Sequence, residues 1–378
     1  MRRVSLIATA SVKLAGINNM NPRKIDIFNH VMPARYLELV KQHSKEAGMV
    51  KRMSSLRMLW DIEARVAMLR EKFADVQQVL TLSLPPPELL GGPDLSPEFA
   101  RVANDGMAEM CAKWPKELPA FIASLPMNNV RAAIEEMDRA IGKLGARGVQ
   151  VCTSVAGRPL DDPEFLPVLE RVTNHHDLPI WMHPVRSATR PDYSNESKSK
   201  YEIWQVLGWP FESSIAMARI VFSGLFERLP RMRIITHHCG GMIPYFAGRA
   251  ETLWAQLGSR STDGEEAEVL KRLKKPPIEY FRMFYGDTVL GGAAAPLACG
   301  LAFFGADRVV FASDCPFDPE GGPMFIREGE RMFDDSRCRS AAGRQGRRSD
   351  LSCAATRSAS RITRSTFRPA IPVRSSSV

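Results

Sequence analysis

Short apolar segments alternate with helical patterns along most of this chain, and this alternation limits the folds available to it. Eight segments are predicted strands, at residues 24–28, 79–84, 121–124, 148–153, 179–182, 233–236, 283–286 and 308–312. Helical patterns lie between them, at residues 60–73, 129–144, 164–174 and 215–226; in 129–144, for example, apolar side chains recur every three or four positions. Two longer connections, at residues 188–209 and 260–277, are predicted to be loops. Strands that alternate with helices form a parallel sheet, and eight of them predict an α/β fold of the closed (β/α)8 barrel, or TIM barrel, type.

An open, doubly wound sheet is the alternative. Such a sheet usually carries a glycine-rich phosphate loop after its first strand. Here that position holds the sequence from Asn29 to Pro33, and neither a G-x-G-x-x-G nor a Walker motif occurs in the chain. The barrel is therefore the favoured architecture, and we expect it to span residues 21–335.

Four of the predicted strands end in a side chain that can bind a metal or carry a proton. These ends hold His30, His183, the pair His237 and His238, and Asp314. The carboxyl ends of the strands form the active site of a (β/α)8 barrel, so these side chains are expected to meet there. Imidazole and carboxylate groups bind zinc, iron and manganese, and an imidazole also transfers protons near neutral pH.

A simpler explanation stays open for several of these residues. His30 can cap its strand, and Asp314 can be a helix N-cap. Arg186 can form a surface salt bridge instead of holding a substrate carboxylate through its planar guanidinium. An acid after the apolar residues 309–313 is nevertheless hard to explain by packing, because a buried carboxylate is costly unless it is paired or binds a metal.

Two further features of the strand ends matter for the site. Only one of His237 and His238 is expected to point into the barrel, and the other should lie in its wall or in the turn. Gly240 and Gly241 favour a sharp turn there, because glycine tolerates positive φ. On the first strand Phe28 lies two residues before the histidine and shares its face, but a phenyl ring has no lone pair to offer a metal.

The net charge of +9 is confined to one end of the chain. Residues 336–378 contain ten Arg and a single acid, Asp350, so the other residues are neutral overall. No nucleic-acid partner is therefore expected for the barrel. We expect residues 336–378 to be either a disordered basic tail or the product of a reading-frame shift near Asp335, because the composition changes abruptly inside what should be the last barrel helix. Residues 1–20 are expected to be a leader outside the fold.

The cysteines and the lengths of the apolar runs indicate the cellular compartment of the protein. The seven cysteines are scattered and form no C-x-x-C pair. An odd, scattered set favours a reducing compartment over a disulfide framework, so we expect a cytoplasmic protein. No run of about 18 apolar residues occurs, so no membrane partner is expected.

The order of the strand-end motifs resembles the amidohydrolase superfamily. Within it, the resemblance is to the branch of aminocarboxymuconate semialdehyde decarboxylase and related aromatic-acid decarboxylases. It rests on x-H on the first strand, H-P on the fifth, H-x-G-G on the sixth and S-D-x-P-F on the eighth. It extends from about residue 24 to about residue 334, with supporting stretches at 125–127, 148–151 and 222–230.

The resemblance implies a barrel of the metal-dependent hydrolase type with one divalent metal ion at its mouth. Zinc is the usual ion, and manganese and iron are the alternatives. By position the ligands are His30, His183 and Asp314, and His238 falls on the catalytic histidine of the family. Phe28 departs from the pattern, because the family has a His or Glu ligand at that position, and this leaves open a barrel that binds no metal.

Three functions are left as alternatives. The first is non-oxidative decarboxylation of a small unsaturated or aromatic carboxylic acid, with His238 transferring the proton and Arg186 orienting a carboxylate. The second is metal-assisted hydrolysis of a lactone or amide, in which Asp314 or His238 carries protons for an attacking water. The third is an inactive barrel without bound metal, or a protein that binds its partners through the basic tail. The resemblance also makes a homodimer an expectation, since dimers are common in this branch.

Overall fold

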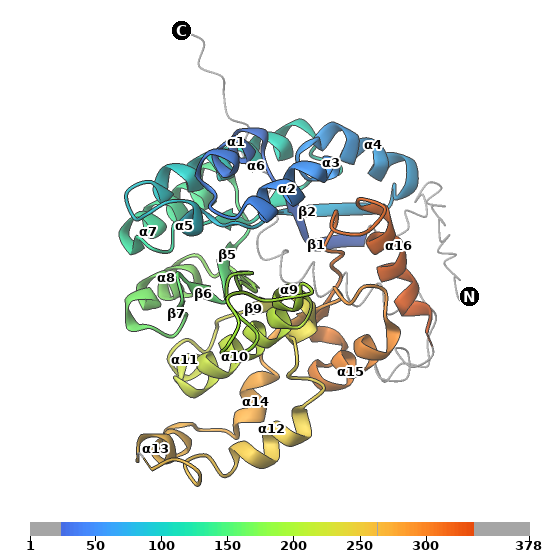
Figure 1. The fold of residues 1–378 in the computed structure, drawn as a ribbon. Coiled ribbons are helices and arrows are strands. Elements are labelled where there is room, and N and C mark those ends of the chain that lie inside the picture. The colour runs from blue at the N-terminus through green and yellow to red at the C-terminus, as the bar shows by residue number, and fades with distance from the viewer. Residues whose placement is uncertain (1–23, 263, 336–378) are drawn as a thin grey trace, which may run out of the picture.

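The computed structural model describes residues 24–262 and 264–335, and it places a ring of parallel strands inside a layer of helices (Figure 1). The barrel strands are β1 (Lys24–Val31), β2 (Val76–Leu82), β3 (Ala120–Phe121), β4 (Ala123–Ser124), β5 (Val149–Cys152), β8 (Ile180–His183), β9 (Ile234–Thr236), β10 (Tyr285–Asp287) and β11 (Val309–Val310). Neighbouring strands pair in the orders β1-β2-β3 and β4-β5-β8-β9-β10-β11. A small antiparallel pair, β6 (Ser154–Val155) and β7 (Arg158–Pro159), forms a separate sheet.

Backbone hydrogen bonds outside these pairings complete the ring. Ile122, between β3 and β4, donates its N–H to β2 at 2.9 Å, so β3 and β4 follow a single path beside β2. Between β11 and β1, Ile27 N–H donates to Phe311 O at 3.0 Å and Asp314 N–H donates to Phe28 O at 3.1 Å. The predicted (β/α)8 barrel is therefore confirmed. An open doubly wound sheet, which would leave two free edges, is not what the chain forms.

Helices follow the strands and cover the outside of the barrel (Figure 1). They are α1 (Ala34–His43), α2 (Ala47–Ser55), α3 (Arg57–Trp60), α4 (Ile62–Lys72), α5 (Pro87–Leu90), α6 (Ser96–Lys113), α7 (Val130–Arg139), α8 (Leu166–Glu170), α9 (Ile203–Val206), α10 (Gly208–Phe222), α11 (Leu225–Arg228), α12 (Ala247–Trp254), α13 (Glu265–Arg272), α14 (Pro277–Phe281), α15 (Ala294–Phe304) and α16 (Pro323–Arg331). In Figure 1, α13 lies at the end of the molecule opposite α1 and α6.

The structure differs from the predicted helices where the backbone changes direction. A single helix over 215–226 is wrong, because Gly224 adopts φ of +77° and separates α10 from α11. The helix predicted over 164–174 is a 3-10 turn, α8 and a π turn in succession. The long connections 188–209 and 260–277 also contain helices, namely α9 with the start of α10, and α13.

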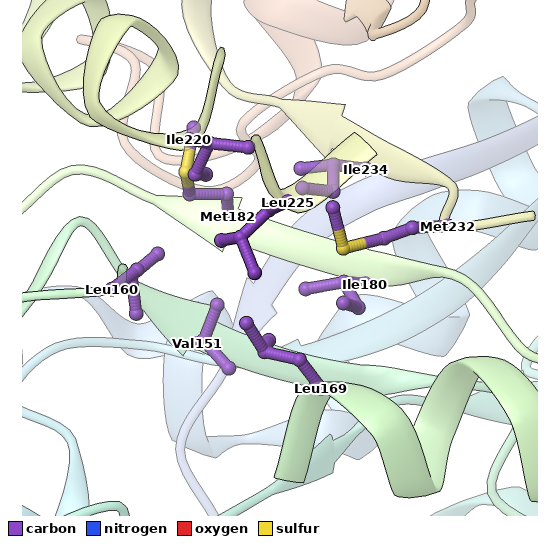
Figure 2. Close-up of a pocket in the computed structure, with 9 residues that line it drawn as sticks. All are labelled: Val151, Leu160, Leu169, Ile180, Met182, Ile220, Leu225, Met232 and Ile234. Carbon is purple, nitrogen blue, oxygen red and sulfur yellow. The ribbon is translucent and has the colours of Figure 1, made fainter. Parts of the chain in front are cut away.

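Two apolar layers hold the barrel together. The inner layer fills the ring with eleven buried side chains, among them Ile27, Phe28, Trp181 and Ile235. The outer layer lies between strands and helices, and Figure 2 shows a small pocket within it, between β5, β8, β9 and the helices α10 and α8. All nine side chains around this pocket are apolar, and those from the strands point away from the barrel interior. The pocket is therefore a packing gap rather than part of a polar site.

The described chain ends in a helix that packs against the first strand. Ile326 and Gly329 of α16 are buried, and Glu330 accepts a hydrogen bond from Lys24 of β1 at 2.7 Å. The expected leader at 1–20 and the expected tail at 336–378 lie outside the described residues. Within residues 24–262 and 264–335, none of the helices combines the length and the apolarity that crossing a membrane requires.

Candidate metal centre

The strand-end side chains meet at the carboxyl end of the barrel. One ring nitrogen from each of His30, His183 and His237 lies within 4.8 Å of the others. Asp314 joins this set, because its Oδ1 lies 3.0 Å from His30 Nε2 and 3.2 Å from His237 Nε2. The first, fifth, sixth and eighth strands therefore converge as expected.

Second contacts orient the rings of His30 and His183. The Thr81 hydroxyl donates to Asn29 O at 2.5 Å, so it accepts a hydrogen bond from His30 Nδ1–H, 3.2 Å away. His183 Nδ1–H donates to the carbonyl of Pro184 at 2.7 Å. In both rings Nδ1 is thus occupied and the Nε2 lone pair is left for a ligand, which is how metal-binding histidines are usually held.

His237 is held in the same way, but by a carboxylate. Its Nδ1–H donates to Asp287 Oδ2 at 2.6 Å. The other oxygen of Asp287 accepts the backbone N–H groups of Cys239 at 2.8 Å and Val289 at 3.1 Å, which fixes the carboxylate in place. Asp287 was missed from the sequence. The signal was present, because it follows the predicted strand 283–286 directly, as Asp314 follows the last strand.

The electrostatics of the cluster favour positive charge at its centre. Burial opposes protonation of His237, but Asp287 and Asp314 outweigh it and raise the pKa of this histidine to about 9. Burial also opposes ionisation of Asp314, yet His237 and His30 hold the pKa of its carboxyl group well below the usual range. Burial, together with the neighbouring His237, lowers the pKa of His183. The two carboxylates therefore surround a position that suits a cation.

His238 lies in the turn, as expected for one histidine of the pair, and its side chain nevertheless reaches the site. His238 and Cys239 both adopt φ of +54°, and this turn brings the side chain of His238 beside His237 and Asp314. Burial and then His237 lower the pKa of His238 to about 4, which leaves a neutral imidazole at neutral pH. Its Nδ1 is buried and has no hydrogen-bond partner among the described residues.

The predicted glycine turn follows directly. Gly240 and Gly241 have φ of +78° and +62°. A Cβ at Gly241 would lie 2.3 Å from Pro210 O, so glycine is needed there for close approach as well as for its backbone angles.

Phe28 lies among the histidines. It is fully buried, and its ring centroid is 4.0 Å from that of His237, 5.6 Å from that of His30 and 6.0 Å from that of His183. The side chain at this position of the first strand therefore forms part of the site but supplies no donor atom.

Asp314 is not a helix N-cap. The helix that follows it, α16, begins after Gly322, and Asp314 itself adopts φ of +63° in a tight turn. A non-glycine residue at positive φ is strained, and such strain is typical of functional sites. The carboxylate instead faces the histidines.

Arg186 forms a salt bridge, but not at the open surface. Its Nη1 lies 2.8 Å from Glu212 Oε1, and its side chain is 11% exposed. The same carboxylate oxygen accepts a hydrogen bond from Arg190 at 2.7 Å. Arg186 Nε remains buried without a hydrogen-bond partner among residues 24–262 and 264–335.

Trp209 is a site residue that sequence reasoning missed. Its ring centroid lies 5.6 Å from that of His183 and 6.3 Å from that of His238. Its indole N–H is buried and unbonded within the described part of the chain. Trp209 ends the connection that was predicted to be a loop, and only the fold brings it to the histidines.

The residues present fit a divalent metal ion. His30 Nε2 is buried and points at Asp314 without the alignment of a hydrogen bond, so it is a polar atom left without a partner in the described structure. Three imidazoles and a carboxylate form the donor set that suits zinc, manganese or iron.

Comparison with known proteins gives the family. The model of the amidohydrolase family matches residues 25–336. The chain belongs to the amidohydrolase family. The strand-end motifs that suggested this family lie within the matched range.

Curated relatives within the family are decarboxylases. The chain is 25% identical to 2-amino-3-carboxymuconate-6-semialdehyde decarboxylase of Dictyostelium discoideum, over 78% of this chain and 82% of that protein. It is 31% identical to gamma-resorcylate decarboxylase of Rhizobium sp. (strain MTP-10005), over 64% of this chain and 73% of that protein.

Solved structures of amidohydrolases share the barrel. The dihydroxybenzoic acid decarboxylase of Polaromonas sp. JS666, solved with bound manganese and the inhibitor 2-nitroresorcinol, matches with a TM-score of 0.69 and 23% identity, over 90% of this chain and 97% of that one. At this identity the likeness establishes the fold alone.

Proposed function

We propose that this amidohydrolase is a metal-dependent non-oxidative decarboxylase of a small aromatic or unsaturated carboxylic acid. The observation that carries the proposal is the convergence of three imidazoles and a carboxylate at the barrel mouth. The curated relatives, which decarboxylate such acids, support it. The protein is therefore proposed to be a carboxy-lyase and not an inactive barrel.

The metal ion is proposed to be held by His30, His183 and Asp314. Zinc is the first candidate from the donor set, while the manganese in the Polaromonas relative favours manganese, and iron suits the same donors. When bound, such an ion supplies a positive charge that stabilises the negative charge developing on the substrate as CO2 leaves.

Arg186 and Trp209 are proposed to orient the substrate. Each has a buried N–H group that makes no hydrogen bond within the described residues. Arg186 lies beside the residue that precedes Trp209, because a Cβ on Gly208 would be 2.6 Å from Cδ of Arg186. Trp209 in turn contacts the ring of His183. A carboxylate or hydroxyl oxygen of the substrate satisfies these donors, since leaving them buried and unbonded is costly.

His238 is proposed to transfer the proton. Decarboxylation breaks the bond between the carboxylate and a carbon atom, and a proton takes the place of the departing CO2 on that carbon. No oxidant or reductant is needed. His238 faces the site and leaves Nδ1 without a hydrogen-bond partner among the described residues, and its ring lies 4.3 Å from that of His237. It can therefore accept a proton from its surroundings and pass it to the substrate.

Release of CO2 tests the proposal. Purified protein, loaded in turn with Zn²⁺, Mn²⁺ and Fe²⁺, is incubated with 2,6-dihydroxybenzoate and related aromatic acids, and CO2 and the decarboxylated product are measured. Metal-dependent CO2 release is expected. Hydrolysis of a lactone or amide by the same residues is the alternative, and it predicts water uptake without CO2. Activity on esters or amides alone would overturn the decarboxylase proposal.

We also propose a cytoplasmic homodimer. Cys111, Cys152, Cys239, Cys299 and Cys315 are all free thiols, which suits a reducing compartment. Nine of the eleven large apolar side chains that are exposed among the described residues fall between residues 193 and 246, including Tyr201, Leu207 and Tyr245, and exposed apolar surface favours association. Sedimentation velocity that shows a monomer at micromolar concentration would contradict the dimer.

A further inference from the structure

We propose that His237 is a fourth protein ligand of the metal ion and makes up for the donor that Phe28 cannot supply. The inference rests on the proposed metal centre and deepens it. Phe28 stands where the family pattern has a His or Glu ligand, so His30, His183 and Asp314 alone leave the set one donor short. His237, from β9, restores it to four.

The orientation of His237 is that of a ligand. His30 and His183 each keep Nδ1 bonded to an oxygen atom and turn Nε2 toward the centre, and His237 does the same. The Nε2 atom of His237 lies 3.2 Å from Asp314 Oδ1, while Asp314 also contacts His30 at 3.0 Å. All three rings are buried, with exposures of 1%, 3% and 0% in the order His30, His183 and His237.

Asp287 strengthens this assignment. A carboxylate that accepts the Nδ1–H of a histidine fixes the tautomer and makes Nε2 a better donor to a metal. Asp287 is itself fixed by the backbone N–H groups of Cys239 and Val289. It therefore holds the His237 ring in one orientation before any ion arrives, whereas Pro184 O and Thr81 hold the other two rings with uncharged oxygens.

The position of His237 also fits a compensating role. Its ring is the one that lies closest to Phe28, with centroids 4.0 Å apart, compared with 5.6 Å for His30 and 6.0 Å for His183. His237 thus stands beside the place where the first strand lacks a donor. His238 differs, because its Nδ1 has no partner in the described chain, and it is left for proton transfer.

Metal affinity tests the assignment without any need for turnover. The affinity for Co²⁺ is measured by chelator competition, and the coordination environment is followed in the visible spectrum of the Co²⁺ protein. His237→Asn is expected to bind Co²⁺ at least about 100-fold more weakly with a changed spectrum, and Asp287→Asn about 10-fold more weakly. His238→Asn is the matched control, and it should change the affinity less than about threefold.

A rescue variant separates ligation from folding. If His237 supplies the donor that Phe28 lacks, Phe28→His in the His237→Asn background should recover at least about 10-fold in Co²⁺ affinity. Asp287→Asn keeps both the imidazole and a side chain of nearly the same shape, so it reports on the ligand set even if His237→Asn does not fold.

The possible results distinguish this inference from the proposed function. The role of His237 would be overturned if folded His237→Asn had the Co²⁺ affinity and spectrum of the wild type. If His237→Asn does not fold, the same result in Asp287→Asn would overturn it. Loss of affinity in both variants supports it, even if the wild type releases no CO2. In that case only the decarboxylase proposal fails.

Discussion

Glu88 is a buried acid on α5 whose Oε2 has no hydrogen-bond partner among the described residues. Burial raises the pKa of its carboxyl group from 4.5 to about 8. The folded protein therefore binds this proton more tightly than the unfolded chain. The contribution to stability is fully present below pH 4.5 and is lost as the pH rises through about 8.

Glu88→Gln should remove this pH dependence. Between pH 5 and pH 9 the free energy of unfolding of the wild type should fall by on the order of 4 kcal/mol more than that of the variant. Urea unfolding at both pH values measures the difference. Glu98→Gln, at an exposed position of α6, is the control and should behave as the wild type. Equal losses of stability in wild type and Glu88→Gln would contradict the prediction.

His183 and His238 are expected to respond differently to replacement. His183→Ala should lose most of the bound metal and all CO2 release, because it removes one of the proposed ligands. His238→Ala should keep the metal and lose at least about 100-fold in kcat, in the range typical of a missing acid–base group. Metal content and initial rates are measured on the same samples, with His175→Ala, an exposed histidine, as the control. Loss of metal in His238→Ala would show that its role has been assigned wrongly.

At the scale of elements, a buried polar network joins the two strands that carry His30 and Asp314. Arg65 of α4 is fully buried, and it donates to the carbonyl of His30 at 2.5 Å, to Asn29 Oδ1 at 2.6 Å and to Gln78 Oε1 at 2.8 Å. The guanidinium therefore holds the end of β1 against α4 and β2.

Asp26 extends the network to the segment that follows β11. It accepts hydrogen bonds from Gln78 Nε2 at 2.8 Å, from Ser313 N–H at 3.0 Å and from Ser313 Oγ at 2.5 Å. Ser313 immediately precedes Asp314. The charges of Arg65 and Asp26 thus balance inside the network, and the seam where the barrel closes is fixed on both sides of the proposed metal ligands.

Arg65→Met should weaken both the barrel and its metal centre. Removing one charge leaves Asp26 buried with only neutral partners, which typically costs about 3–5 kcal/mol. Chemical unfolding of the metal-free protein measures the stability, and Co²⁺ competition measures the affinity. Arg70→Met, on the same helix but in a surface pair with Glu117, is the control and should change neither quantity appreciably. A similar response of the two variants would contradict a special role for Arg65.

The strands were predictable because they are apolar, short and regularly spaced. All eight predicted strands are present, with ends displaced by no more than three residues, as in β1, where 24–28 became Lys24–Val31. The break between α10 and α11 was not predicted, because the apolar pattern runs on through Gly224 and only its positive φ ends the helix. A propensity pattern does not reveal a backbone angle.

The site was predictable as a set of strand ends but not as a set of contacts. His30, His183 and Asp314 come within two residues of the ends of their predicted strands, and barrel geometry brings such positions together. The place of His237 between Asp287 and Asp314 depends on a turn in which His238 adopts positive φ. Non-glycine residues seldom adopt that conformation, so sequence reasoning had no reason to expect it.

At the scale of the whole molecule, a ligand that binds only the folded barrel should stabilise it. The proposed metal ligands lie at or after the ends of different strands, so the unfolded chain cannot assemble them. At a free Zn²⁺ or Mn²⁺ concentration about 100 times the dissociation constant, the expected gain is about 2.7 kcal/mol. Thermal unfolding with and without a chelator measures it. His183→Ala is the control, and a shift in Tm that persists in this variant would place the ion elsewhere.

The last prediction tests the proposed domain boundaries. It rests on where the charge and the similarity to the family lie along the chain. The basic residues that give the net charge of +9 lie after residue 335, while the family match covers 25–336. The last described helix, α16, already covers the first strand through Ile326 and the pair of Glu330 with Lys24. A chain of residues 21–335 should therefore fold, and its affinity for Co²⁺ should lie within about threefold of that of the full chain. It should also lose the retention on a cation-exchange column that the ten arginines confer. Circular dichroism, Co²⁺ competition and chromatography of both chains measure the three outcomes. If the shorter chain is unfolded, residues outside 21–335 complete the barrel, and the proposed boundary is wrong.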